Sequence, residues 1–132
     1  MKTKIILILT LVACMTAHAI ETIPLRNGKK TMPAISLFAG YEENEVAMDA
    51  AVKGKRIYLF GTVETVGKDV RGRAYVLLSA GEAVGGVQCF FRDNSLQLLA
   101  AMRKGQRVFL SGTVLGKIGN VLLDECLVED PL

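Results

Sequence analysis

The same alternation of apolar and polar residues occurs twice in this chain. Residues 53–63 read KGKRIYLFGTV, and residues 104–114 read KGQRVFLSGTV. Each copy is typical of a turn followed by a strand rich in β-branched and aromatic residues, with a glycine where a strongly coiled strand can bend. The intervening segment does not repeat, so the pattern predicts one domain with two equivalent long strands of a small barrel.

Further elements follow from the spacing of apolar residues along the rest of the chain. Helical spacing, with acids in the early turns, predicts a short helix within Phe38–Val52. A leucine-rich amphipathic segment predicts a second helix, which starts at the capping residues Asp93–Ser95 and ends at Lys104–Gly105. Five strands are expected at about Lys55–Val66, Arg73–Ser79, Val87–Phe91, the second copy of the repeat, and Val121–Val128.

This order of elements is the layout of the OB-fold, a small Greek-key barrel in which the first and fourth strands pair. Such pairing would explain the repeat, because the first and fourth strands carry its two copies. The predicted fold class is therefore mainly β: a five-stranded OB-fold Greek-key barrel with a helix between strands 3 and 4 and a short N-terminal helix. We expect residues 38–132 to form it around a single core.

The first nineteen residues have the anatomy of a secretory signal peptide. A basic start is followed by the apolar run Ile5–Met15 and the small-residue exit Ala17–Ala19. The run is too short for a permanent membrane span, so an exported, periplasmic protein is expected. The segment Leu11–Cys14 also resembles the lipobox of bacterial lipoproteins, in which Cys14 would carry a lipid and anchor the protein to a membrane. Cleavage after Ala19 and lipidation at Cys14 stay as two alternatives.

The segment at residues 20–37 shows no sustained period. It contains Pro24, Pro33 and the polar run Arg26–Lys30. This composition is typical of a solvated linker, and predicts a flexible N-terminal arm.

The charge of the mature chain excludes a strongly basic protein. Without Lys2 and Lys4, the sixteen basic residues fall to fourteen, against thirteen acidic ones.

The single histidine, His18, lies in the signal, which argues against histidine catalysis or ligation of a metal by histidine. No catalytic triad, phosphate-binding glycine loop or zinc pattern is present. We therefore expect no enzyme activity, no cofactor and no metal.

Two cysteines, Cys89 and Cys126, remain after the signal. An even count in an oxidising compartment favours a disulfide over free thiols. The alternative is that both are buried, reduced and act as small apolar fillers. The absence of a Cys-x-x-Cys spacing argues against a thiol-redox role.

Several short motifs between Phe38 and Val128 resemble the tRNA_anti-like family of short exported bacterial OB-fold proteins, sometimes called nucleic-acid-binding lipoproteins. The family name records a structural similarity to anticodon-binding domains, so the resemblance implies the fold and supplies no demonstrated ligand. The motifs are Tyr41 with Asn44–Ala47 and Asp49, Lys53–Lys55, Gly61–Val63, Gly86–Phe91, Lys104–Gln106 and Asp124–Cys126.

The resemblance also bears on the cysteines. Cys89 and Cys126 fall on the third and fifth strands, which are neighbours in an OB-fold. The resemblance therefore predicts a Cys89–Cys126 disulfide.

The usual binding surface of an OB-fold is the face of strands 2 and 3 with the loops joining strands 1 to 2 and 4 to 5. Aromatic faces flanked by cations suit single-stranded nucleic acid, because any base can stack and the cations follow the phosphates. The alternative is that the aromatic rings pack under the loops or the helix while the cations are only solvated. On this chain the surface would gather Lys68, Arg71, Arg73, Tyr75, Phe90, Arg92 and Lys117.

Three possibilities stay open for a monomeric, non-enzymatic module. One is binding of single-stranded nucleic acid outside the cytoplasm, another is binding of an envelope protein or glycan, and the third is a structural helper subunit of an envelope assembly, which copurifying partners would reveal. Salt separates the first two, because nucleic-acid binding releases counterions and weakens steeply as the salt concentration rises, whereas a largely apolar protein contact changes little.

Overall fold

The computed structural model describes residues 21–132. The predictions for the signal peptide at 1–19, for lipidation at Cys14 and for His18 lie outside the described residues.

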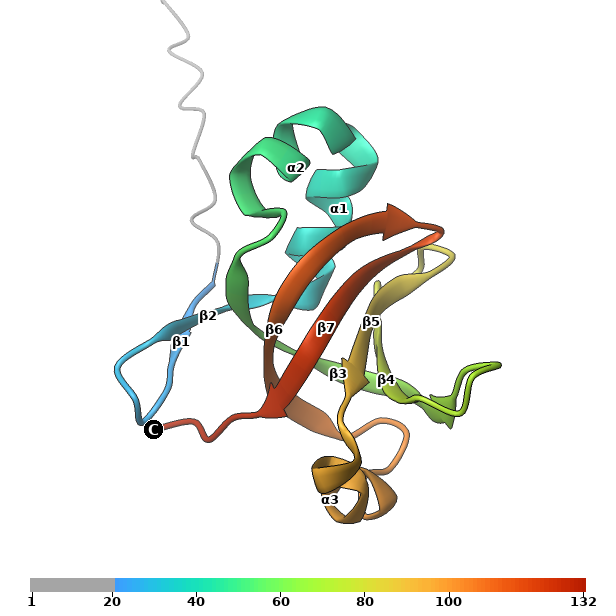
Figure 1. Ribbon diagram of the computed structural model, residues 1–132. Coiled ribbons are helices and arrows are strands. Elements are labelled where there is room, and N and C mark those ends of the chain that lie inside the picture. The colour runs from blue at the N-terminus through green and yellow to red at the C-terminus, as the bar shows by residue number, and fades with distance from the viewer. Residues whose placement is uncertain (1–20) are drawn as a thin grey trace, which may run out of the picture.

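Five strands close into a barrel (Figure 1), which confirms the mainly β class and gives the chain an OB-fold-like architecture. Around the barrel the order is β3, β4, β5, β7 and β6, and β6 pairs back onto β3. The pairs are antiparallel except β5 with β7, which run parallel. The strands are β3 (Arg56–Lys68), β4 (Ala74–Ser79), β5 (Gly86–Phe91), β6 (Arg107–Ile118) and β7 (Asn120–Val128).

The two copies of the repeat pair with each other. Leu59 of β3 lies opposite Leu110 of β6, and both side chains are buried in the barrel. The shared glycine makes room for a neighbour in each copy. A Cβ at Gly61 would lie 3.1 Å from the Cβ of Ala34, and one at Gly112 would lie 2.6 Å from the Sγ of Cys126. The repeated glycine therefore admits close packing of other elements against both long strands.

The described part of the 20–37 segment is not the flexible arm that the sequence suggested. It forms a hairpin of β1 (Ile23–Pro24) and β2 (Lys30–Pro33), and β2 adds parallel to β3. Leu25 and Leu37 are fully buried, and the C-terminal residues bridge to Leu25 through Pro131. Isolated apolar residues thus order a segment that shows no period, because the barrel supplies the surface that buries them.

Two helices cover one end of the barrel (Figure 1), whereas the sequence predicted a single short helix within Phe38–Val52. They are α1 (Ala34–Glu43) and α2 (Glu45–Val52), and the Asn44 side chain between them accepts a hydrogen bond of 3.0 Å from the backbone N–H of Ala47. The hydroxyl of buried Tyr41 donates to Asp49 Oδ1 at 2.9 Å. Burial first, and then this bond, raises the pKa of Tyr41.

The helix between β5 and β6 is short. A 3-10 turn η1 (Asp93–Ser95) leads into α3 (Leu96–Ala100), which ends before the expected Lys104–Gly105. Only Leu99 of α3 is buried, so few contacts favour a longer helix.

Within residues 21–132, no helix has the length and apolar character needed to cross a bilayer. The same residues contain no cluster of three or more His, Cys, Asp or Glu side chains able to hold a metal ion.

Cys89 and Cys126 lie on the neighbouring strands β5 and β7, inside the barrel core. Both are buried free thiols in the structure, so their bridging stays a prediction. Burial, together with the adjacent Cys89 thiol, raises the pKa of Cys126. The native Cys126 thiol is therefore poorly reactive towards thiol-alkylating reagents, which react with the thiolate.

Candidate nucleic-acid interface

Two aromatic side chains meet on the outer surface of β4 and β5. Tyr75 lies directly opposite Phe90, with ring centroids 6.1 Å apart and an edge-to-face angle of 66°. The neighbouring residues Val76 and Cys89 point into the core, as alternation along the strands requires. Tyr75 and Phe90 are not members of the core cluster, so they form an external aromatic pair rather than part of the barrel interior.

Gly67 provides the surface on which the Tyr75 ring rests. The two residues are register partners on β3 and β4. A Cβ at position 67 would lie 3.0 Å from the Tyr75 hydroxyl oxygen and 3.2 Å from the carbon that carries it. A side chain at this position would therefore have to displace the Tyr75 ring.

The loop between β3 and β4 is organised by one carboxylate, that of Asp69. It accepts hydrogen bonds from the backbone N–H groups of Arg71 at 2.9 Å and Arg73 at 2.8 Å, and from Arg73 Nε at 3.0 Å. Gly72 takes the positive φ of 79° that closes the turn. Desolvation acts to raise the pKa of Asp69, but the hydrogen bonds from Arg73 and Arg71 outweigh it and hold the pKa below its usual value.

Arg73 lies between this loop and the aromatic pair. Its guanidinium carbon is 4.2 Å from the centroid of the Phe90 ring, a cation–π distance, while its Nε bonds Asp69. Phe90 is only 6% exposed, which agrees with the alternative that this ring is packed rather than open for stacking. The groups that remain accessible are the outer plane of the Arg73 guanidinium and the half-buried Tyr75 ring.

The other predicted cations divide into two groups. Lys68 and Arg71 flank the loop, are exposed, and have no acidic partner within 4.0 Å among residues 21–132. Arg92 follows the last residue of β5 and is paired with Glu125 of β7. The structure therefore brings Lys68, Arg71 and Arg73 together and leaves Arg92 as a neutralised neighbour.

Lys117 does not belong to this surface. Its Nζ lies 3.1 Å from Glu42 Oε1 of α1 and 5.8 Å from the Phe38 ring, so it secures the N-terminal helices. On the sheet it is the register partner of Val121, at the end of the barrel away from the β3–β4 loop. Lys117 was included by analogy with the usual OB-fold surface, and that analogy does not reveal that its side chain pairs with Glu42 at the other end of the barrel.

Sequence reasoning missed Asp69 and Gly67 as members of the site. The Asp-x-x-Gly pattern of residues 69–72 was the available signal, since Asp at the start of a turn commonly accepts backbone hydrogen bonds. No local signal identified Gly67, whose role depends on a ring from the next strand.

Replacement of Asp69 by asparagine is expected to lower the melting temperature at neutral pH. In strong acid the variant and the wild-type protein should melt at the same temperature. The lowered pKa means that the ionised carboxylate stabilises the folded state above its unfolded pKa of about 3.9, and that this contribution is lost as pH falls through the folded value. Thermal melts of both proteins from pH 7 to pH 2 measure the difference between their melting temperatures. Asp130→Asn, which changes an exposed carboxylate elsewhere, is the control. A difference in melting temperature that stays constant with pH would contradict the stabilising role of the ionised Asp69 carboxylate.

Comparison with known proteins gives one family and several structures. A family model described as tRNA_anti-like matches residues 2–127. The chain is similar to a "putative nucleic acid-binding lipoprotein" from Klebsiella pneumoniae subsp. pneumoniae MGH 78578, with 14% identity, a TM-score of 0.61, and coverage of 74% of this chain and 91% of that chain. At this identity the likeness concerns the fold alone. A search of the curated proteins gives no match.

Two looser structural likenesses have TM-scores too low to carry an argument. OBody AM3L09 bound to hen egg-white lysozyme is 17% identical, with a TM-score of 0.46 and coverage of 62% of this chain and 88% of that chain. Asparaginyl-tRNA synthetase from Pyrococcus horikoshii is 17% identical, with a TM-score of 0.44 and coverage of 62% of this chain and 20% of that chain.

Proposed function

The chain belongs to the tRNA_anti-like family, and we propose that it is a non-enzymatic, exported OB-fold module that binds single-stranded nucleic acid beside the β3–β4 loop. In this proposal α3 is the helix of the OB-fold between its third and fourth strands. The proposal takes the protein to be a monomer, either released by cleavage after Ala19 or anchored by a lipid at Cys14.

One observation carries the proposal: Arg73 is held in place from two sides. Asp69 fixes its Nε and the Phe90 ring lies beneath its guanidinium. A guanidinium ordered before the ligand arrives loses little conformational entropy on binding. Its outer plane and the adjacent Tyr75 ring are surfaces on which unpaired bases can stack.

The two unpaired cations supply the complementary charge. Lys68 and Arg71 stand on either side of Asp69 at the mouth of the hairpin. In the proposed complex they follow the phosphates of a strand whose bases stack on Tyr75 and Arg73. Such contacts do not read base identity, so binding is expected to be tolerant of sequence.

Binding of an envelope protein or glycan is the second candidate, and the tip of the same loop favours it. Val70 is fully exposed between Asp69 and Arg71. An apolar side chain at a loop tip suits a protein contact better than a phosphate backbone. Salt-insensitive capture of a partner by this loop would support the second candidate.

The test is an anisotropy titration of labelled single-stranded DNA and RNA with residues 20–132 at low and moderate salt. We expect binding that weakens as salt rises, and the double variant Lys68→Gln/Arg71→Gln is expected to bind roughly tenfold less tightly. Its salt slope should fall by about 1.4, that is, about 0.7 for each phosphate contact.

The control is Lys29→Gln/Lys30→Gln, which removes the same charge from the exposed β1–β2 hairpin. Equal losses in the two double variants would mean that only net charge matters. Absence of binding by the wild-type protein at low salt would reject nucleic acid as the ligand.

A further inference from the structure

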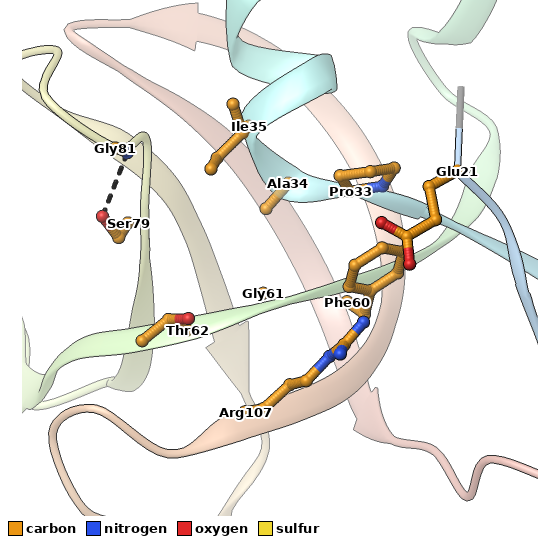
Figure 2. A pocket seen from close by; sticks show the side chains of 10 residues that line it. All are labelled: Glu21, Pro33, Ala34, Ile35, Phe60, Gly61, Thr62, Ser79, Gly81 and Arg107. Carbon is orange, nitrogen blue, oxygen red and sulfur yellow. Dashed lines mark hydrogen bonds between the residues drawn. The ribbon is translucent and has the colours of Figure 1, made fainter. Parts of the chain in front are cut away.

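A cavity of about 480 Å³ lies on a different part of the barrel (Figure 2). Its floor is the half of β3 that pairs with β6, and its walls are the first turn of α1 and the segment after β4. The aromatic pair, in contrast, lies over the half of β3 that pairs with β4. The cavity shares no residue with the candidate nucleic-acid interface, so it needs an explanation of its own.

The most distinctive group in the cavity is the guanidinium of Arg107. Its carbon lies 4.6 Å from the centroid of the Phe60 ring and 5.8 Å from that of Phe109. Figure 2 shows the side chain extending from the start of β6 to the Phe60 ring. Among residues 21–132, no carboxylate lies within 4.0 Å of Arg107 and no acceptor bonds its guanidinium. Arg107 is therefore positioned by two aromatic rings and retains its N–H donors for a ligand.

Two hydroxyl groups line the same cavity. The Ser79 oxygen accepts the backbone N–H of Gly81 at 3.1 Å, which leaves the Ser79 hydroxyl proton free to donate. Thr62 lies on the floor, two residues beyond Phe60, with its side chain exposed. Together with Arg107 they make three sources of hydrogen-bond donors around one cavity.

The remaining wall is apolar. Pro33, Ala34 and Ile35 form it at the start of α1, and Ile35 is 52% exposed although it faces the cavity. The carboxylate of Glu21 lies at the rim near Phe60. A ligand must therefore present an acceptor to Arg107 and an apolar body to Ile35, and must tolerate a negative charge at the rim.

We propose that this cavity binds a small apolar carboxylate, with the carboxylate on Arg107 and the apolar body against Ile35. The planar fork of arginine matches the two oxygens of a carboxylate. A single guanidinium beside Glu21 favours a monoanion over a doubly charged phosphate, because the second charge would be repelled without compensation. The volume lies within the range of small-molecule sites. The ligand can be a free acid or the last residue of a peptide, since both present the same chemistry.

The test is a titration of residues 20–132 followed by amide chemical shifts, with N-acetyl-leucine, N-acetyl-leucinamide and inorganic phosphate as separate probes. We expect N-acetyl-leucine to shift the amides of Thr62, Ser79 and Gly81 with saturation, and the neutral amide and phosphate to bind at least about tenfold more weakly. The dipeptide acid N-acetyl-alanyl-leucine distinguishes the sources, because tighter binding than N-acetyl-leucine points to a peptide C-terminus and weaker binding to a free acid.

Three variants make the result specific. Arg107→Gln is expected to weaken N-acetyl-leucine binding about tenfold or more, which is the usual size for loss of a charge-assisted hydrogen bond. Arg103→Gln removes an exposed arginine outside the cavity and should leave binding unchanged. Thr62→Val keeps volume at an exposed strand position, so it tests the site even if Arg107→Gln fails to fold. Equal binding of acid and amide, no binding of the acid, or an unchanged affinity in Thr62→Val and Arg107→Gln would overturn the proposal.

Discussion

Oxidation of Cys89 and Cys126 to a disulfide is expected to raise the free energy of unfolding by about 3 to 4 kcal/mol. The two buried thiols lie on adjacent strands, and a bridge between them would close a loop of 37 residues, from 89 to 126. In the loop-entropy account, such a bridge stabilises mainly by restricting the unfolded chain. Urea unfolding of oxidised and reduced protein, followed by far-ultraviolet circular dichroism, measures the difference.

The control for this measurement is Cys89→Ala, whose unfolding midpoint should not respond to reductant. Both thiols are buried in the folded protein, so they must be counted by alkylation in denaturant. Protein recovered from an oxidising compartment should then show no alkylated thiol before reduction. Two alkylated thiols in that sample, with identical midpoints with and without reductant, would contradict the disulfide.

Replacement of Tyr75 by alanine is expected to weaken single-stranded nucleic-acid binding about 5- to 150-fold. Loss of one stacked base amounts to about 1 to 3 kcal/mol, and Tyr75 is the one ring of the external aromatic pair that Arg73 does not cover. The same anisotropy titration at fixed low salt measures the change in Kd. Tyr75→Phe should restore most of the affinity, because phenylalanine keeps the ring and loses only the hydroxyl.

Tyr58→Ala is the matched control for this variant. Tyr58 is another half-buried tyrosine, on the half of β3 that pairs with β6, away from the β3–β4 loop. Its replacement should leave the affinity unchanged. Unchanged affinity in Tyr75→Ala, or an equal loss in Tyr58→Ala, would show that bases do not stack at the proposed position.

The long strands illustrate what periodicity can predict. The two copies of the repeat were expected to pair, and β3 and β6 do so with Leu59 opposite Leu110. The pairing could be predicted because the repeat and the two-residue period of a strand are local properties of the sequence. Along β4 the same period separates fully buried Val76 from half-buried Tyr75.

The N-terminal segment shows the limit of the same reasoning. Pro24 and Pro33 stand at strand ends, which their missing N–H allows, and the polar run between them is the turn of a hairpin. Leu25 and Leu37 are too far apart to form a period. Their burial depends on β3, on α1 and on the C-terminal residues, so no window of the sequence contains the information.

The sequence by itself determined the class of the fold, its closing strand pair and the residue types that gather on β4 and β5, because alternation, turn residues and the repeat are encoded locally. Only the tertiary structure decided which cations act together. Arg73 is held by Asp69 and Phe90, whereas Lys117 is drawn to Glu42 at the other end of the barrel. It also placed Arg107 over Phe60 beside a cavity. Interactions between distant side chains depend on how strands close and helices pack, and those contacts have no counterpart in the local pattern.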